Sequence, residues 1–205
     1  MKTIGLSGRM KAGKSTVAEY LSTYIPDSAI HGFSDGIKTL AIDYFCENDM
    51  DFNSQEVKSQ LHQSGKTYRQ ILQECGTKMR EIWPEVWIYS WQSFVRGLPL
   101  SVCIVPDVRF PNEVKAIQDM GGIVIRLTRN PVDSDDQTET ALDNYVDGDN
   151  RVGDKYFDYI IGNDNLTVNQ TNKITMPICQ TDQPQQNRVQ IQIQIRITAE
   201  RYVKR

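Results

Sequence analysis

The sequence predicts an α/β protein in which a parallel sheet lies between two layers of helices. Two observations predict this fold class. Short apolar runs typical of strands alternate along the chain with segments of helical periodicity, which is the order that produces parallel sheets. In addition, the first apolar run, at residues 3–6, leads through a glycine-rich loop into the first helical segment. Together these features indicate a three-layer fold that binds a ligand at the loop.

Length and composition exclude several other classes of protein. The chain has 205 residues, enough for one large domain or for one domain with an appendage. Its net charge of −3 argues against binding to a nucleic-acid polymer. Four cysteines lie far apart in the sequence, which favours a reducing compartment over a disulfide framework. Without an apolar signal or membrane segment, we expect a cytoplasmic protein that binds no membrane.

The elements are expected in a regular order. Strands are expected at residues 3–6, 28–33, 100–105, 123–127 and 156–161. Helices are expected after the glycine loop, with helical spacing over residues 17–24, and at residues 37–45, 68–82, 84–94 and 111–120, with a loop or short helices at 47–66. Pro84 suits a first helical turn. Gly121 ends the helix before it, so the letters D-x-x-G at residues 119–122 indicate a helix stop rather than a GTPase motif.

The last part of the chain has a different pattern. Residues 181–187 are a polar linker, and residues 189–197 alternate strictly between β-branched and polar side chains, which predicts a strand. Such a strand must pair with its own sheet or with a second chain, and we favour a homodimer. The expected division is a first domain at 1–171, which contains a polar segment at about 129–155 that suits a lid, and a β-prone extension at 172–205.

Residues 8–15 match the pattern G-x-x-x-x-G-K-[ST] between a strand and a helix. About one chain in a hundred of this length would match by chance, from average residue frequencies. In such a loop, backbone N–H groups surround a phosphate, Lys14 reaches the β- and γ-phosphates, and the Ser15 hydroxyl binds Mg²⁺. The sequence therefore predicts a P-loop NTPase fold.

Charged residues follow two of the expected strands. Asp107 and Arg109 follow the buried run 100–105, where ligands of parallel sheets gather. Asp107 would bind Mg²⁺ through water, accept a hydrogen bond from a substrate hydroxyl, or simply form an ion pair with Arg109. Arg126 and Arg129 lie at the end of the strand 123–127, and they would stabilise a transferred phosphoryl group as the lid closes. The missing aspartate at residue 175 disfavours a GTPase.

These motifs resemble, in their order and spacing, the deoxynucleoside monophosphate kinases of T-even bacteriophages. The resemblance covers residue 1 to about residue 171. It rests on residues 8–16, 33–38, 68–73, 76–77, 87, 104–109, 121–126, 138–139 and 160–164. The segment before Tyr68 is shorter than in the T-even enzyme, and the tail has no counterpart there.

The resemblance implies ATP with Mg²⁺ as phosphoryl donor and a deoxynucleoside 5′-monophosphate as acceptor. It implies donor contacts from Gly8, Lys11, Ala12, Gly13, Lys14, Ser15, Thr16, Asn163 and Asp164. It implies acceptor contacts from Lys38, Arg69, Gly76, Thr77, Trp87, Glu139 and Thr140, with the last two in the lid. The catalytic residues that it implies for the transferred phosphoryl group are Lys14, Asp107, Arg109 and Arg129. The residues that it implies for binding Mg²⁺ are Ser15 and Asp107.

Two alternatives remain at this point. A dephospho-coenzyme A kinase shares the P-loop, a lid and an asparagine turn before the last helix, although the 69–77 helix and the pair Asp107 and Arg109 favour the nucleotide kinase. A nucleotide-binding scaffold that uses its tail for assembly and turns over little belongs to a different class. The intact Lys14, Ser15, Asp107 and Arg129 argue against it.

Overall fold

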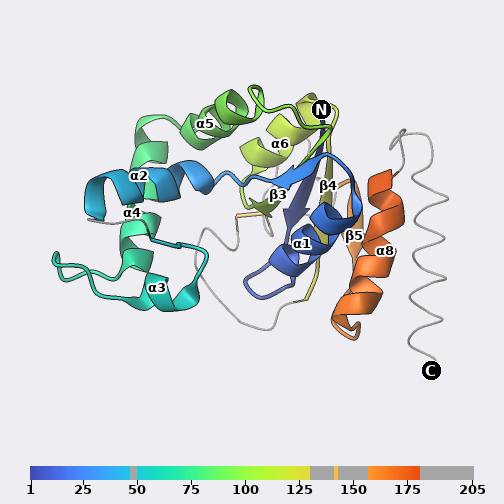
Figure 1. Ribbon diagram of the computed structural model, residues 1–205, viewed down its shortest axis with the longest axis horizontal. Coiled ribbons are helices and arrows are strands. Elements are labelled where there is room, and N and C mark those ends of the chain that lie inside the picture. Colours follow the sequence, from blue (N-terminus) through green and yellow to red (C-terminus); the bar gives the residue numbers. More distant parts are fainter. Residues whose placement is uncertain (47–49, 130–140, 143–156, 181–205) are drawn as a thin grey trace. The chain divides into compact units, whose positions relative to one another are not determined.

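The strand β1 (Lys2–Ser7) is the middle strand of a five-stranded sheet (Figure 1). The other strands are β2 (Ser28–Ile30), β3 (Val102–Val108), β4 (Ile123–Leu127) and β5 (Tyr159–Ile161). They lie in the order β2-β3-β1-β4-β5 and every pair is parallel. Because β3 and β4 flank β1 on opposite sides, the chain changes direction at β1, and ligands of such sheets bind at the carboxyl end of this strand.

The computed structural model describes residues 1–46, 50–129, 141–142 and 157–180. They form two units, one of residues 1–31 with the described residues from 99 onward, and one of residues 32–98. The sheet belongs to the first unit. The expected lid lies outside the described residues except for residues 129, 141 and 142, and the expected strand at 189–197 lies outside them too.

Helices cover both faces of the sheet. The helices α1 (Lys14–Tyr24) and α8 (Val168–Gln180) share one apolar cluster with Ile4 and Leu6 of β1. On the opposite side of β1, Gly5 faces the helix α6 (Pro111–Asp119), since a Cβ atom at Gly5 would lie 2.7 Å from Ile117 Cδ1. Alternate residues of a strand point to opposite faces, so the predicted three-layer α/β fold is confirmed.

The strand β3 extends further than the sequence predicted. The expected end at residue 105 is wrong, because β3 continues through Pro106 to Val108. Gly5 pairs with Val105 and Ser7 pairs with Val108, so β3 advances three residues where β1 advances two. This bulge accommodates a proline, which has no N–H group to give to a neighbouring strand. The bulge therefore places Asp107 among the last residues of β3 rather than beyond the end of the strand.

The helix α8 crosses the division expected at residue 171. Its side chains at Ile174 and Ile178 are buried in the cluster that contains β1. The first unit therefore continues at least to Gln180, and an extension that begins at residue 172 is wrong.

The described residues of the second unit form four helices. They are α2 (Asp35–Phe45), α3 (Gln55–Ser59), α4 (Tyr68–Ile82) and α5 (Val86–Val95). The helices α2 and α5 approach closely at Gly36, where a Cβ atom would lie 2.7 Å from Ser90 Oγ. Helix α5 begins after the turn that contains Pro84, so the expected start at Pro84 is two residues early. None of the described helices is both long enough and apolar enough to cross a bilayer.

The thiol of Cys179 on α8 gives a test of this packing. Burial raises the pKa of Cys179 to about 12, because a thiolate would lose its hydration there. At pH 8 only about one thiol in ten thousand would then be ionised. We expect iodoacetamide to leave Cys179 unmodified in the folded protein and to modify it in denaturant, as measured by peptide mass mapping. Complete labelling of Cys179 under native conditions would contradict the position of α8.

Candidate functional site

The loop from Gly8 to Gly13 joins β1 to α1 in the form that an anion site requires. Lys11 and Gly13 have positive φ angles of 62° and 101°, and the Ala12 N–H donates to Arg9 O at 3.1 Å. A Cβ atom at Gly8, where φ is 147°, would lie 2.7 Å from Leu127 O. Only glycine therefore fits at Gly8, and the loop lies directly against the end of β4.

Lys14 folds back over this loop. Its Nζ donates to Gly8 O at 2.6 Å and to Arg9 O at 2.9 Å. The helix α1 begins at Lys14 without a hydrogen bond from a side-chain cap, so its N-terminal N–H groups and its dipole are directed at the loop. The side chains of Ser15 and Thr16 are exposed in the first turn. A phosphate at the loop would therefore meet an ammonium group, backbone donors and two hydroxyl groups.

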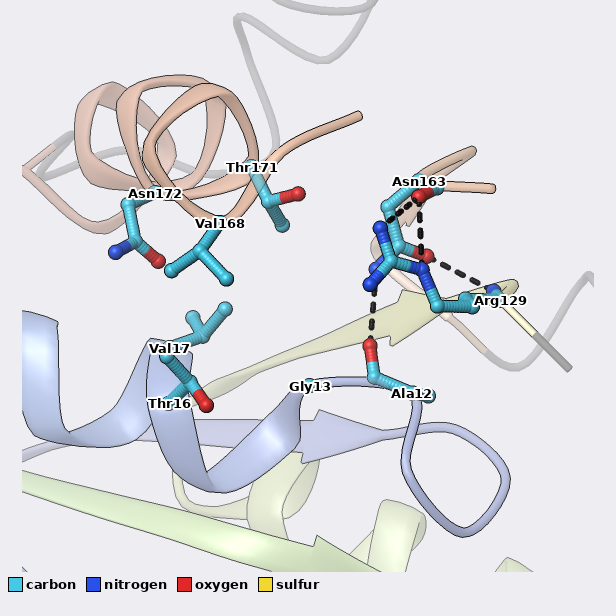
Figure 2. Close-up of a pocket in the computed structure, with 9 residues that line it drawn as sticks. All are labelled: Ala12, Gly13, Thr16, Val17, Arg129, Asn163, Val168, Thr171 and Asn172. Atoms are coloured by element: carbon cyan, nitrogen blue, oxygen red, sulfur yellow. Dashed lines mark hydrogen bonds between the residues drawn. The ribbon is translucent and has the colours of Figure 1, made fainter. Parts of the chain in front are cut away.

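Asn163 ties the end of β5 to the phosphate loop (Figure 2). Its Nδ2 donates to Ala12 O at 2.9 Å, and its Oδ1 accepts from the Arg129 N–H at 2.8 Å. The guanidinium of Arg129 donates to Asn163 O at 2.7 and 3.1 Å and also to Leu166 O. Asn163 is only 2% exposed, so these bonds hold the turn, the arginine and the loop in one arrangement.

A pocket opens between the phosphate loop and α8. Its lining residues come from the loop and α1, from the two residues just described, and from α8. They are Ala12, Gly13, Thr16, Val17, Arg129, Asn163, Val168, Thr171 and Asn172. Thr16, Arg129 and Asn163 were predicted from the sequence, but the three residues of α8 were not, because no helix was expected at residues 168–180. Arg129 contacts the turn here, and its predicted action on a transferred phosphoryl group remains a prediction.

Asp107 and Arg109 lie where β3 ends beside β1. A buried carboxylate fixes this corner, because Glu113 Oε2 accepts from the N–H groups of Arg109 at 2.7 Å and of Phe110 at 3.0 Å. Glu113 is 2% exposed and was missed by the sequence reasoning. Its signal was present, since a glutamate at the third position of a helix often accepts from the backbone before it. Ser7, which pairs with Val108, brings the corner next to the start of the phosphate loop.

Arg126 approaches the same edge from β4. Its Nη1 donates to Ser7 Oγ at 3.1 Å, and its guanidinium lies 5.4 Å from the centre of the Phe157 ring. The carboxyl ends of β1, β3 and β4 therefore bring Lys14, Asp107 and Arg126 to one edge of the sheet. This is the edge at which parallel sheets bind their ligands.

Comparison with known proteins places the chain in a family. No family model matches the chain. Over 155 residues it is 30% identical to a protein of Acanthamoeba polyphaga mimivirus named "Putative deoxynucleotide monophosphate kinase", and the alignment covers 66% of this chain and 78% of that protein. The chain belongs to a deoxynucleotide monophosphate kinase-like family. Membership in this kinase family indicates a phosphotransferase.

Five of the predicted acceptor residues of this kinase-like chain, Lys38, Arg69, Gly76, Thr77 and Trp87, belong to the second unit. Lys38 Nζ donates to Asp35 Oδ1 at 2.8 Å and to Asn53 Oδ1 at 3.0 Å, and Arg69 Nη2 donates to Gln55 Oε1. Both cations are thus held on short polar side chains that an anion can replace. Thr77 is exposed on α4, one residue after the buried Gly76.

Trp87 is buried in the second unit. It is only 4% exposed, and its Nε1 donates to Gly76 O at 3.1 Å. The indole is therefore part of the core of this unit, where it bonds to Gly76 of α4, and its contact with an acceptor remains a prediction. The predicted lid residues Glu139 and Thr140 lie outside the described residues. Asp164 is exposed and accepts from Thr128 Oγ1 at 3.1 Å.

Proposed function

We propose that this protein transfers the γ-phosphoryl group of ATP to a deoxynucleoside 5′-monophosphate, giving the diphosphate and ADP. The observation that carries the proposal is the position of Lys14, whose ammonium is held over the phosphate loop by two carbonyl oxygens at 2.6 and 2.9 Å. Neutral carbonyls are weaker partners for a cation than phosphate oxygens. The name of the mimivirus relative supports a deoxynucleotide as acceptor.

The residues at the edge of the sheet fit Mg²⁺ as a partner of the triphosphate. Mg²⁺ prefers oxygen ligands and keeps several waters, and the site offers the Ser15 hydroxyl and the Asp107 carboxylate. Among the residues that the structure describes, no three histidine, cysteine, aspartate or glutamate side chains gather to hold a metal by themselves. Ser15 would therefore bind an ion that also contacts the phosphates, and the ion would neutralise charge there.

In this reaction the protein mainly positions the two nucleotides and neutralises the negative charge of their phosphates. The acceptor phosphate is already an anion, so no strong general base is needed for its oxygen to attack the γ-phosphorus. As the bond to the bridging oxygen of ADP breaks, negative charge accumulates on the transferred group and on the leaving oxygen. Lys14 would stabilise this charge, and Arg109, at the end of β3, would orient the acceptor.

Substitution of Arg69 separates the acceptor from the donor. We expect Arg69→Ala to raise KM for the monophosphate about tenfold or more, because a charge-assisted bond to phosphate is lost, and to change KM for ATP little. Lys78→Ala is the matched control on α4, since the Lys78 side chain is 72% exposed and pairs with Glu81 of the same helix. Steady-state kinetics with each substrate varied in turn give both constants. Equal effects on the two KM values would place Arg69 outside the acceptor site.

A coupled assay of ADP release tests the function as a whole. The purified protein is supplied with ATP, Mg²⁺ and, in separate reactions, each of the four deoxynucleoside monophosphates or dephospho-coenzyme A. We expect turnover with at least one monophosphate and none above background with dephospho-coenzyme A. Turnover with dephospho-coenzyme A alone would replace the proposed acceptor. Absence of acceptor-dependent ADP release in all five reactions would contradict the proposed function.

A further inference from the structure

Asn172 on α8 holds a buried hydrogen-bond acceptor for which the described part of the chain offers no donor. The side chain is 4% exposed, and its Oδ1 has no hydrogen-bond partner among the residues that the structure describes. Its polar neighbours on the same helix differ, because Thr171 Oγ1 donates to Thr167 O at 3.1 Å and Thr175 Oγ1 donates to Thr171 O at 2.8 Å. Buried polar atoms are nearly always satisfied in folded proteins. An unsatisfied amide oxygen therefore suggests a partner that arrives with a ligand.

This amide lies in the wall of the pocket beside the phosphate loop (Figure 2). Asn172 and Val168 line the pocket from α8, and Val17 lines it from α1, while Arg129 lies across from them with Asn163. Val168 is an apolar residue that is nevertheless 49% exposed. Two valines and a planar guanidinium suit a flat, uncharged ring, and a guanidinium stacks well on an aromatic face. The pocket also contains the hydroxyls of Thr16 and Thr171, and the Thr171 hydroxyl already donates to Thr167 O, whereas the Asn172 amide oxygen is left for a ligand.

We propose that Asn172 Oδ1 accepts a hydrogen bond from the exocyclic amino group of the adenine ring of the donor, and so makes the site select adenine over guanine. The inference rests on the proposed function, which supplies a triphosphate at the neighbouring loop. Adenine carries an amino donor at the ring position where guanine carries a carbonyl acceptor. Two acceptors would face each other with guanine, and a site that needs a donor rejects a ligand that lacks one.

Asn172 takes no part in the bonds that form and break during phosphoryl transfer. We therefore class it as a specificity-determining residue. The selectivity should therefore appear in the donor constants, and KM for the monophosphate should stay as it is.

The test removes the amino group from the donor and the amide from the protein. ATP, GTP and purine-riboside 5′-triphosphate, which has hydrogen in place of the amino group, are compared as donors. We expect the wild-type protein to use ATP about tenfold better in kcat/KM than the purine analogue, as loss of one buried hydrogen bond implies, and to use GTP still less. In Asn172→Leu the difference between ATP and the purine analogue should vanish. Thr175→Val, which removes a satisfied hydroxyl from the same helix, should keep it.

Nucleotide binding without an acceptor separates this inference from the proposed function. The rise in Tm on adding ADP or purine-riboside 5′-diphosphate is measured for the wild-type and Asn172→Leu proteins. A larger rise with ADP in the wild type, lost in Asn172→Leu, supports the role of Asn172 even if no monophosphate is phosphorylated. Equal rises with the two diphosphates in the wild-type protein would overturn it, and this comparison needs no variant to fold. If Asn172→Leu kept the full preference for ATP over the purine analogue, the proposal would be overturned as well. The Asn172 amide would then bond to water alone.

Discussion

Replacing Lys14 with alanine is expected to lower kcat/KM about 10³-fold or more while the protein remains folded. The ammonium that lies over the phosphate loop would be lost, and a cation that stabilises a transferring phosphoryl group contributes about 4 kcal/mol to transition-state stabilisation. The fold should tolerate the change, because Lys14 Nζ donates to backbone carbonyls of the loop, at Gly8 and Arg9. Those carbonyls can turn to water.

Lys115→Ala is the matched control for Lys14→Ala. Lys115 lies on α6, where its side chain is 74% exposed and pairs with Asp119 of the same helix. Such a pair contributes little to stability, so we expect ordinary kcat/KM and an ordinary melting curve. Initial rates of ADP release and thermal denaturation followed by circular dichroism give both quantities. Near-normal turnover in a well-folded Lys14→Ala protein would contradict a P-loop kinase.

The sequence predicted best those elements whose ends carry their own chemical signals. The helix α4 spans the expected residues Tyr68–Ile82. Its start is set by Thr67 and Gln70, since the Thr67 N–H donates to Gln70 Oε1 at 2.8 Å and the Gln70 N–H donates to Thr67 Oγ1 at 3.3 Å. The end of α6 was equally clear, because Gly121 adopts a positive φ of 75°. Local signals of this kind need no knowledge of the rest of the fold.

The end of β3 could not be predicted from local signals. Proline normally excludes a central strand position, so the sequence reasoning ended the strand before Pro106. The structure resolves this conflict with a bulge against β1, which depends on residues about a hundred positions earlier in the chain. The same bulge determines where Asp107 lies. The position of this candidate residue could therefore not be predicted from the residues beside it in the sequence.

The helix α8 was missed although one signal for it was present. Thr167 and Gln170 exchange the same pair of hydrogen bonds as Thr67 and Gln70. Within the helix, however, polar residues alternate with apolar ones and Pro177 interrupts the pattern. Threonine hydroxyls that bond to the carbonyl four residues earlier allow such residues to be buried. No helix was expected at these residues, and the wall of the pocket that contains Asn172 was missed with it.

The phosphate loop shows which parts of a site a sequence motif can predict and which parts it cannot. The pattern of residues 8–15 located the loop, the helix that follows it and Lys14. It did not reveal that the turn at Asn163 is bonded to the loop, because this contact joins residues separated by 151 positions. The resemblance to phage kinases indicated the turn, and only the three-dimensional structure gives its bonds to Ala12 and Arg129.

The turn at Asn163 provides the second large effect. Asn163→Ala should lower the free energy of unfolding of the first unit by about 2 to 4 kcal/mol, since the buried Ala12 O and Arg129 N–H would both lose their partner. Because the same amide holds the phosphate loop, we also expect KM for ATP to rise about tenfold or more. Denaturant unfolding measures the first change and steady-state kinetics measure the second.

Asn165→Ala controls for the loss of an asparagine side chain from the same turn. Asn165 is exposed, and a substitution at an exposed turn position usually changes stability by no more than about 0.5 kcal/mol. The two variants therefore differ in whether the amide bridges the phosphate loop and Arg129. If Asn163→Ala unfolded at the same denaturant concentration as Asn165→Ala and bound ATP equally well, the turn would not be what orders the loop. The loop would then owe its form to Gly8, which lies against Leu127 O, and to the positive φ angles of Lys11 and Gly13 alone.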